Sequence, residues 1–208
     1  MRALRLLVTG FGPFPGAPVN QSAQVVQALA RVAPDWARRG FVLSTHILPV
    51  VFDVERALAP LVARERPDRI LHLGVATRSR VVAIEVAARN RVSCVRPDAR
   101  GRVAGAMTLG RGPARRLPHT SGAKAAVAMR RAGAPARVSV DAGAYVCNAL
   151  YWAALDPGAG RGQIPTLFLH IPPARRLAPS RIAVALARAA PFLFSRSPAG
   201  GCTDGWKT

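Results

Sequence analysis

The chain has 208 residues, with 30 Lys or Arg against 10 Asp or Glu, which gives a formal net charge of +20. Half of the residues are hydrophobic and only 19% are charged, so an intrinsically disordered chain is excluded. No window offers about 18 uninterrupted apolar residues, and the N-terminal apolar run is short, so we expect neither a membrane-spanning helix nor a secretory signal.

Strand-like and helix-like segments alternate along the chain. Apolar and β-branched runs predict strands at residues 4–9, 41–51, 69–73, 81–87, 136–140 and 165–171. Apolar residues at helical spacing predict helices at residues 22–32, 54–66, 121–132, 145–155 and 180–190. The segment 101–118 has no clear period and is expected to be a long loop. This alternation predicts one α/β domain over residues 1–208 with a mainly parallel central sheet, and residues 199–208 are expected to form a flexible tail.

The positive charge suggests nucleic acid as a first hypothesis, since phosphate contacts by Lys and Arg dominate such binding. Lys124 and Lys207 are the only lysines, so 28 of the 30 cations are arginines, and they are scattered along the chain. No zinc-finger spacing, aromatic-interleaved strand or basic helix with heptads accompanies them. We therefore favour a solvated basic surface, and a protein that binds acidic partners or RNA remains the alternative.

Three cysteines at irregular spacing, Cys94, Cys147 and Cys202, do not form a disulfide framework and indicate a reducing, cytoplasmic setting. Cys147 follows a predicted strand and a run of small residues, and it falls in the first turn of a predicted helix. Unpaired backbone N–H groups and the helix dipole would favour a thiolate there. The alternative is a buried structural cysteine.

Two further residues have positions that suggest chemistry. His170 ends a predicted core strand, where an α/β sheet presents residues to its site, and could exchange a proton with Cys147. Glu85 lies inside an apolar strand, where a carboxylate is costly unless it is paired; it would suit the third position of a nucleophile triad. The alternatives are a histidine bonded to a backbone carbonyl and a glutamate on a polar face.

The first predicted strand ends in a turn that contains Phe11 and Phe14. Pro13 removes an amide donor and the turn lacks the pattern of a phosphate loop, so the two rings favour a small apolar pocket. No cluster of His, Cys, Asp or Glu has the spacing of metal ligands, so neither a metal nor another cofactor is expected.

Taken together, these segments resemble the pyroglutamyl peptidase I family, cysteine peptidases that are also called pyrrolidone-carboxylate peptidases and that remove an N-terminal pyroglutamate. The segment around Cys147 is the most specific part of the match. The similarity runs in order through Val8–Phe14, Asn20, Leu48–Phe52, Gly74, Ile84–Glu85, Asn90, Pro97–Asp98, Gly101, Ala142–Asn148 and His170–Pro172.

The resemblance implies a three-layer α/β/α sandwich and a Cys-His-Glu triad that works through a thioester acyl-enzyme. Cys147 would be the nucleophile, His170 the general base and acid, and Glu85 the residue that supports the histidine. It also implies small peptide substrates with N-terminal pyroglutamate and a homo-oligomer, a dimer or tetramer. The residues expected to bind substrate are Phe11, Phe14, Asn20, Val75, Arg96, Tyr145 and Val146.

Two departures from the family pattern concern the substrate pocket. Members usually carry Asp-Ala-Arg after the Asn that matches Asn90, whereas this chain has Ser93-Cys94-Val95 with Arg96 one place later. A Gln common after the matching Gly is Val75 here. A diverged member with altered amide or lactam specificity, or a non-catalytic descendant with a basic binding surface, is therefore the alternative interpretation.

Overall fold

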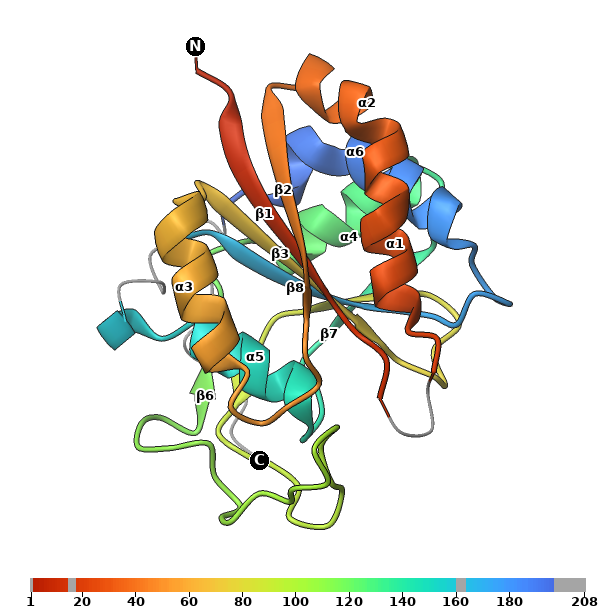
Figure 1. Cartoon of the computed structure of the whole chain (residues 1–208). Coiled ribbons are helices and arrows are strands. Elements are labelled where there is room, and N and C mark those ends of the chain that lie inside the picture. The colour runs from red at the N-terminus through yellow and green to blue at the C-terminus, as the bar shows by residue number, and fades with distance from the viewer. Residues whose placement is uncertain (1, 15–17, 160–163, 197–208) are drawn as a thin grey trace, which may run out of the picture.

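The computed structural model describes residues 2–14, 18–159 and 164–196, so the expected tail at 199–208 lies outside the described residues. A central sheet has six strands, visible in Figure 1. They are β1 (Leu4–Phe11), β2 (Phe41–Leu48), β3 (Arg69–Val75), β4 (Val82–Glu85), β7 (Ala136–Ser139) and β8 (Thr166–Ile171). Their order across the sheet is β2-β1-β3-β8-β4-β7.

The directions of the strands confirm a mostly parallel sheet. Of the five neighbouring pairs, four are parallel and only β8 and β4 are antiparallel. Strands β4 and β7 therefore run against the other four. This reversal matters for the site, because it brings residues near the beginning of β4 and β7 beside the carboxyl end of β8.

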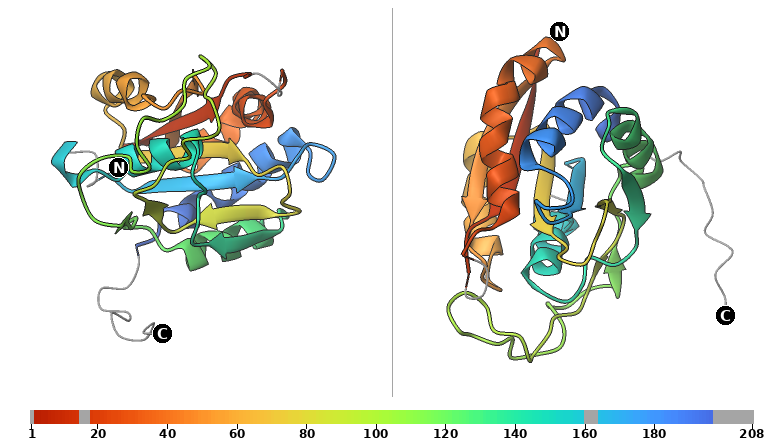
Figure 2. Two further views of the ribbon diagram at one scale, coloured as in Figure 1. Left: turned by 90° about the horizontal axis from the view of Figure 1, so that it is seen from below. Right: turned by 90° about the vertical axis from the view of Figure 1, so that its right-hand side faces the viewer.

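Helices cover both faces of the sheet. They are α1 (Gln21–Leu29), α2 (Ala33–Arg38), α3 (Glu55–Glu65), α4 (Gly122–Arg131), α5 (Val146–Ala154) and α6 (Pro179–Leu193). Helix α6 packs between α1 and α4, whereas α3 packs against α5. Figure 2 shows α4 and α6 on the side of the sheet opposite to α3 and α5. The three-layer α/β/α sandwich is thereby confirmed, and none of the described helices is long and apolar enough to cross a membrane.

Each face of the sheet has its own apolar core, as the alternation of side chains along a strand requires. Leu71, Leu73 and Ile84 face the α1, α4 and α6 layer. Ile70 and Phe168 face the α3 and α5 layer. Burying each such side chain contributes about 1.5–3 kcal/mol, so the two cores hold the strand ends that carry the candidate site in fixed positions.

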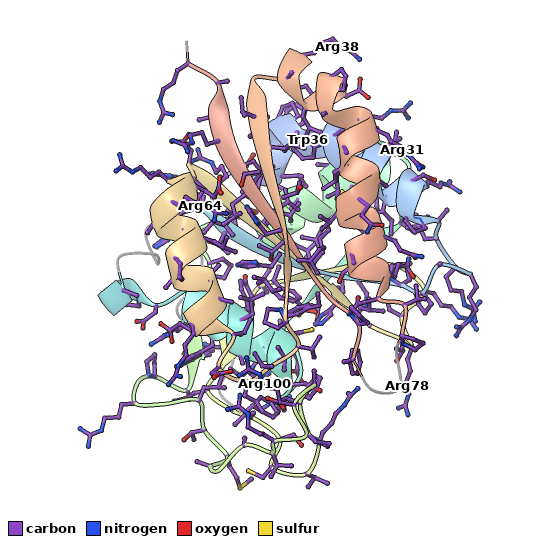
Figure 3. The ribbon with its side chains drawn as sticks, viewed as in Figure 1. Arg31, Trp36, Arg38, Arg64, Arg78 and Arg100 are labelled. Atoms are coloured by element: carbon purple, nitrogen blue, oxygen red, sulfur yellow. The ribbon has the colours of Figure 1, made fainter. Side chains whose placement is uncertain are left out.

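Two elements differ from the sequence prediction. Helix α2 was not expected, because six residues are too few to display a period; Pro34 stands in its first turn. Its Trp36 is buried and meets Phe41 edge-to-face, with ring centroids 5.7 Å apart. In Figure 3, Trp36 lies inside the molecule, whereas Arg31 and Arg38 lie at its margin.

The segment expected to be an unstructured loop contains a short strand. Strand β6 (Arg115–Arg116) pairs with β5 (Ala88–Arg89) in a second, two-stranded sheet. Asn90 holds the same segment, since its Nδ2 donates to the carbonyl of Gly110 at 2.8 Å and its Oδ1 accepts from the N–H of Leu109 at 2.9 Å. These long-range bonds give no local periodicity, which is why the sequence did not reveal them.

Candidate active site

Cys147 lies in the first turn of α5, two residues after the N-cap residue Tyr145. No side chain caps this helix end, so the backbone N–H groups of the first turn are available to a substrate oxygen. The turn that leads into the helix is fixed by Asp141, which accepts a bond from the N–H of Gly143 at 2.9 Å and ion-pairs with Arg91 at 2.7 Å. Gly143 has a φ of +84°, a conformation that favours glycine.

His170 and Glu85 form a buried hydrogen-bonded pair. His170 Nδ1 lies 2.9 Å from Glu85 Oε1, and the two residues are 8% and 1% exposed. The antiparallel pairing of β4 with β8 sets Glu85 opposite Phe168 and Ala83 opposite His170. The side chains of Glu85 and His170 therefore project from the same face of neighbouring strands.

The imidazole of His170 also hydrogen-bonds the side chain of Cys147. Burial lowers the pKa of His170, but the hydrogen bonds to Cys147 and Glu85, together with the charges of these two groups, outweigh it and raise the pKa to about 10. The three side chains thus form a connected chain from thiol to imidazole to carboxylate. Such an arrangement can activate a nucleophile and then return its proton to a leaving group.

Residues behind the pair hold it in place. The hydroxyl of Tyr151, on α5, donates to the carbonyl oxygen of Glu85 at 2.9 Å. The ring of Phe168 packs against both Tyr151 and His170, with centroid distances of 5.5 and 5.0 Å. The second carboxylate oxygen of Glu85 is buried and has no partner among the described residues.

A cavity of about 730 Å³ opens over these residues. Cys147, His170 and Glu85 all line it. So do the residues that the sequence suggested for substrate binding, which are Phe11, Phe14, Asn20, Val75, Arg96, Tyr145 and Val146. One concave site therefore contains every candidate residue, although they come from distant parts of the chain.

One wall of the cavity is aromatic. The ring of Tyr145 meets Phe52 edge-to-face at 5.6 Å and lies 6.4 Å from Phe14. The hydroxyl of Tyr145 donates to the carbonyl of Pro97 at 2.7 Å, which fixes the ring. The guanidinium of Arg96 stacks on this wall, 4.3 Å from the Tyr145 centroid and 5.9 Å from that of Phe14.

The chain is similar in sequence and in fold to known proteins. A sequence model described as pyroglutamyl peptidase matches residues 4–193. The chain belongs to the pyroglutamyl peptidase family. The predicted family and enzyme class, a cysteine peptidase of the pyroglutamyl peptidase I type, are thereby confirmed.

Individual relatives cover most of the chain. The pyrrolidone-carboxylate peptidase of Oceanobacillus iheyensis is 30% identical over 176 residues, which are 84% of this chain and 86% of the relative. Pyrrolidone-carboxylate peptidase 1 of Ralstonia nicotianae is 36% identical over 171 residues, 80% of this chain and 77% of the relative. The crystal structure of pyroglutamyl peptidase I from Bacillus amyloliquefaciens superposes with a TM-score of 0.79 at 27% identity and covers 92% of this chain and 96% of that one.

The positions that depart from the pyroglutamyl peptidase pattern differ in their relation to the cavity: Val75 lines it, whereas Ser93, Cys94 and Val95 are not among the described residues of its lining. Ser93 Oγ accepts weak hydrogen bonds from the N–H groups of Val95 and Arg96, at 3.3 and 3.4 Å. Val95 is 88% exposed and Cys94 is exposed as well. Arg96, one place later, is the residue of this turn that lines the cavity.

Several of the predicted binding residues also stabilise the structure around the cavity. Asn20 is the N-cap of α1, where its Oδ1 accepts from the N–H of Ser22 at 3.1 Å, and its Nδ2 donates to the carbonyl of Gly12 at 3.0 Å. Phe11 and Val146 are 3% and 1% exposed. These three residues therefore shape the cavity mainly through packing and backbone position.

Sequence reasoning missed three groups around the site. Asn148 and Tyr151 were not singled out, although both face inward from α5 and bond backbone groups. Arg137, on the edge strand β7, lines the cavity. The helical periodicity of α5 indicated that Asn148 and Tyr151 face inward. The position of Arg137 at the cavity depends on the order of the strands in the sheet, which no local pattern shows. Among the described residues, no group of three or more His, Cys, Asp or Glu side chains is arranged to hold a metal ion.

Proposed function

We propose that this chain hydrolyses the amide bond after an N-terminal pyroglutamyl residue, with Cys147 as nucleophile, His170 as general base and acid, and Glu85 as the residue that orients the imidazole. The observation that carries the proposal is the connected arrangement of Cys147, His170 and Glu85 at the wall of one cavity. Family membership supports the same activity.

In the first step, the sulfur of Cys147 attacks the carbonyl carbon of pyroglutamate, after its proton has passed to His170. The tetrahedral oxyanion would be stabilised by the open backbone N–H groups at the start of α5, which are preorganised and need little rearrangement. When the C–N bond breaks, His170 gives its proton to the leaving amine, and a thioester remains on Cys147.

In the second step, water attacks the thioester. His170 takes a proton from that water, the C–S bond breaks, and the proton returns to the sulfur, so pyroglutamate leaves and the enzyme is regenerated. Glu85 would keep the ring in one orientation and stabilise its protonated form through the 2.9 Å hydrogen bond. It is a positioning residue, because it acts through the imidazole of His170.

The lactam ring would lie against the aromatic wall. Phe14 and Tyr145 offer flat apolar surfaces next to the nucleophile, and Phe11 and Val146 lie behind them in the same cavity lining. Arg96 is already stacked on the wall, so it would cover the lactam rather than pair with a charge at the scissile bond.

The test uses pyroglutamyl-7-amido-4-methylcoumarin. The parent should release the fluorophore, Cys147→Ala should release none above background, and iodoacetamide should abolish turnover while labelling Cys147. Cys94 is exposed and offers a matched control, because Cys94→Ala should keep both the activity and its sensitivity to the alkylator. Turnover by Cys147→Ala at the parent rate would contradict the nucleophile. Rapid labelling of Cys147 without pyroglutamyl cleavage would favour the hydrolysis of another amide or lactam.

A cytoplasmic, homo-oligomeric enzyme is part of the same proposal. Cys94 and Cys147 are free thiols, which is typical of a reducing compartment. Light scattering coupled to size-exclusion chromatography would give the mass of the assembly, and a mass of about 22 kDa, that of one chain, would contradict it.

A further inference from the structure

Four residues stand side by side across the sheet at the level of the nucleophile. The strand register pairs His170 with Gly74 on one side and with Ala83 on the other, and it pairs Ala83 with Arg137. Register partners in a sheet project from the same face. Gly74, His170, Ala83 and Arg137 therefore form one row, on β3, β8, β4 and β7, and Cys147 packs over its first member.

This row indicates how a bound substrate would be oriented in the cavity. Phe11 and Phe14 lie at the carboxyl end of β1, which neighbours β3 on the side away from β8. The proposed lactam site is therefore on the β1 side of Cys147, and the leaving residue would extend past His170 toward β4 and β7. Its path crosses Ala83, which lines the cavity and has a small side chain.

Arg137 lies two strands beyond His170, so their α-carbons are roughly 10 Å apart at about 4.8 Å per strand. The substrate residue that follows pyroglutamate would place its amide nitrogen beside His170. At a distance of roughly 10 Å, the guanidinium of Arg137 could reach the end of that residue's side chain or its C-terminal carboxylate. Arg137 and Ser139 both line this part of the cavity.

The charges in this part of the cavity are not balanced. Asp141, which also lines the cavity, is already paired with Arg91, at 2.7 Å, and with Arg89. Glu85 is bonded to His170. Among the described residues, Arg137 has no carboxylate partner, and its one side-chain bond is a long one, 3.4 Å, to the carbonyl of its neighbour Val138.

We propose that Arg137 is a specificity residue that binds a carboxylate on the residue after pyroglutamate, so that acidic pyroglutamyl peptides are the preferred substrates. This inference rests on the proposed function. The carboxylate has two sources: the side chain of an acidic second residue, or the free C-terminus of a dipeptide. Both would approach Arg137 from the direction of His170.

Two pairs of peptides separate these sources. Pyroglutamyl-glutamic acid amide against pyroglutamyl-glutamine amide tests the side chain, and pyroglutamyl-alanine against its amide tests the C-terminus. In at least one pair the acidic member should have kcat/KM about threefold to fivefold higher at low salt, the range expected for one exposed ion pair. The ratio should decline toward one in 0.5 M NaCl, because salt screens such pairs.

The variants distinguish Arg137 from the general positive charge. Arg137→Gln should bring the ratio to about one, and Arg137→Lys should retain part of it because the charge remains. Arg188→Gln removes the same charge from an exposed position on α6, on the other face of the sheet, and should keep the parent's ratio.

The outcomes separate this inference from the proposed function. Equal cleavage of acidic and neutral peptides by the parent would overturn the role of Arg137 and leave the proposed function standing. If Arg188→Gln also lost the higher kcat/KM on acidic peptides, the preference would be due to the overall positive charge, and the role of Arg137 would again be overturned. Failure to cleave any of the four peptides would reject the proposed function, and the specificity with it.

Discussion

The sulfur of Cys147 occupies the space that a side chain on Gly74 would need: a β-carbon on Gly74 would lie 2.8 Å from Sγ. It would also lie 3.0 Å from the ring of Phe168, which supports His170. Gly74 pairs with His170 in the sheet. The absence of a side chain at this one position therefore lets the nucleophile settle next to its base.

Gly74→Ala should displace the thiol or the Phe168 ring. We expect kcat/KM on a pyroglutamyl amide to fall by about 10²-fold, the effect of a misplacement near 1 Å, and the free energy of unfolding to fall by about 1–3 kcal/mol through overpacking. Steady-state kinetics and urea denaturation measure the two effects. Gly105→Ala is the control, because a β-carbon there meets no atom within 4 Å; a Gly74→Ala enzyme with the parent's kcat/KM would contradict the steric role.

Two buried histidines on neighbouring strands show how partners decide a pKa. His72, on β3, is wholly buried, and burial lowers its pKa to about 3. Its Nδ1 lies 2.7 Å from the hydroxyl of Thr9, which carries no charge. His170, on β8, is buried too, yet Cys147 and Glu85 raise its pKa to about 10. A neutral hydroxyl does not compensate for desolvation of an imidazolium, whereas a carboxylate does.

The two pKa shifts affect the stability of the fold in opposite ways as the pH changes. Protonation of His170 stabilises the fold fully below pH 6.5, the ordinary pKa of the unfolded side chain, and this contribution is lost as the pH rises through about 10. The neutral form of His72 behaves in the opposite way: its contribution is complete above pH 6.5 and is lost as the pH falls toward 3.

NMR titration of the imidazole resonances tests both directions. His170 should remain protonated through neutral pH and titrate near 10, and His72 should not titrate between pH 5 and 9. Glu85→Gln removes the carboxylate charge, so it should lower the pKa of His170 without moving that of His72, and kcat at pH 7 should fall by about 10²-fold. A His170 resonance with the same midpoint in Glu85→Gln would contradict the positioning role of Glu85.

The α/β class and the mainly parallel sheet could be derived from the sequence because the strands and most helices carry strong periodic patterns, whereas the three-layer arrangement was implied by the family resemblance. Local pattern also located Cys147 at a helix start, His170 near a strand end and Glu85 in a strand, although β4 ends at Glu85 rather than continuing to residue 87. It gave no information on the direction of β4 and β7, which depends on long-range pairing with β8. The row from Gly74 to Arg137 follows from that pairing, so it could not be predicted.

Polar anchors were missed for a different reason. An asparagine in a predicted apolar helix looks the same whether it faces water or bonds a distant loop. Asn148 is completely buried and reaches the segment at β5, which is more than 50 residues away in the sequence. Tyr151 reaches Glu85 in the same way, from one face of α5 to the strand below.

Asn148 connects the helix that carries the nucleophile to the segment that leads to Arg96. Its Oδ1 accepts from the N–H of Arg89 at 2.9 Å, and its Nδ2 donates to the carbonyls of Arg89 and Arg91 at 2.7 and 2.9 Å. Asn148→Ala would remove all three bonds and leave the N–H of Arg89 and the carbonyl of Arg91 without these partners, each costing about 1 kcal/mol or more. The carbonyl of Arg89 keeps a bond from the N–H of Arg91 at 2.8 Å. We expect the free energy of unfolding to fall by about 2–4 kcal/mol, measured as a lower urea midpoint.

The matched variant Asn148→Asp keeps the size and the acceptor but replaces the donor with a second oxygen facing two carbonyls. It should therefore keep the bond to the N–H of Arg89 while losing the other two, so it separates acceptor from donor contributions. Because Arg91 also holds Asp141 at the turn before Cys147, Asn148→Ala should lower kcat/KM even at temperatures where it is folded. A variant with the parent's urea midpoint would show that the 89–91 segment is held by other contacts.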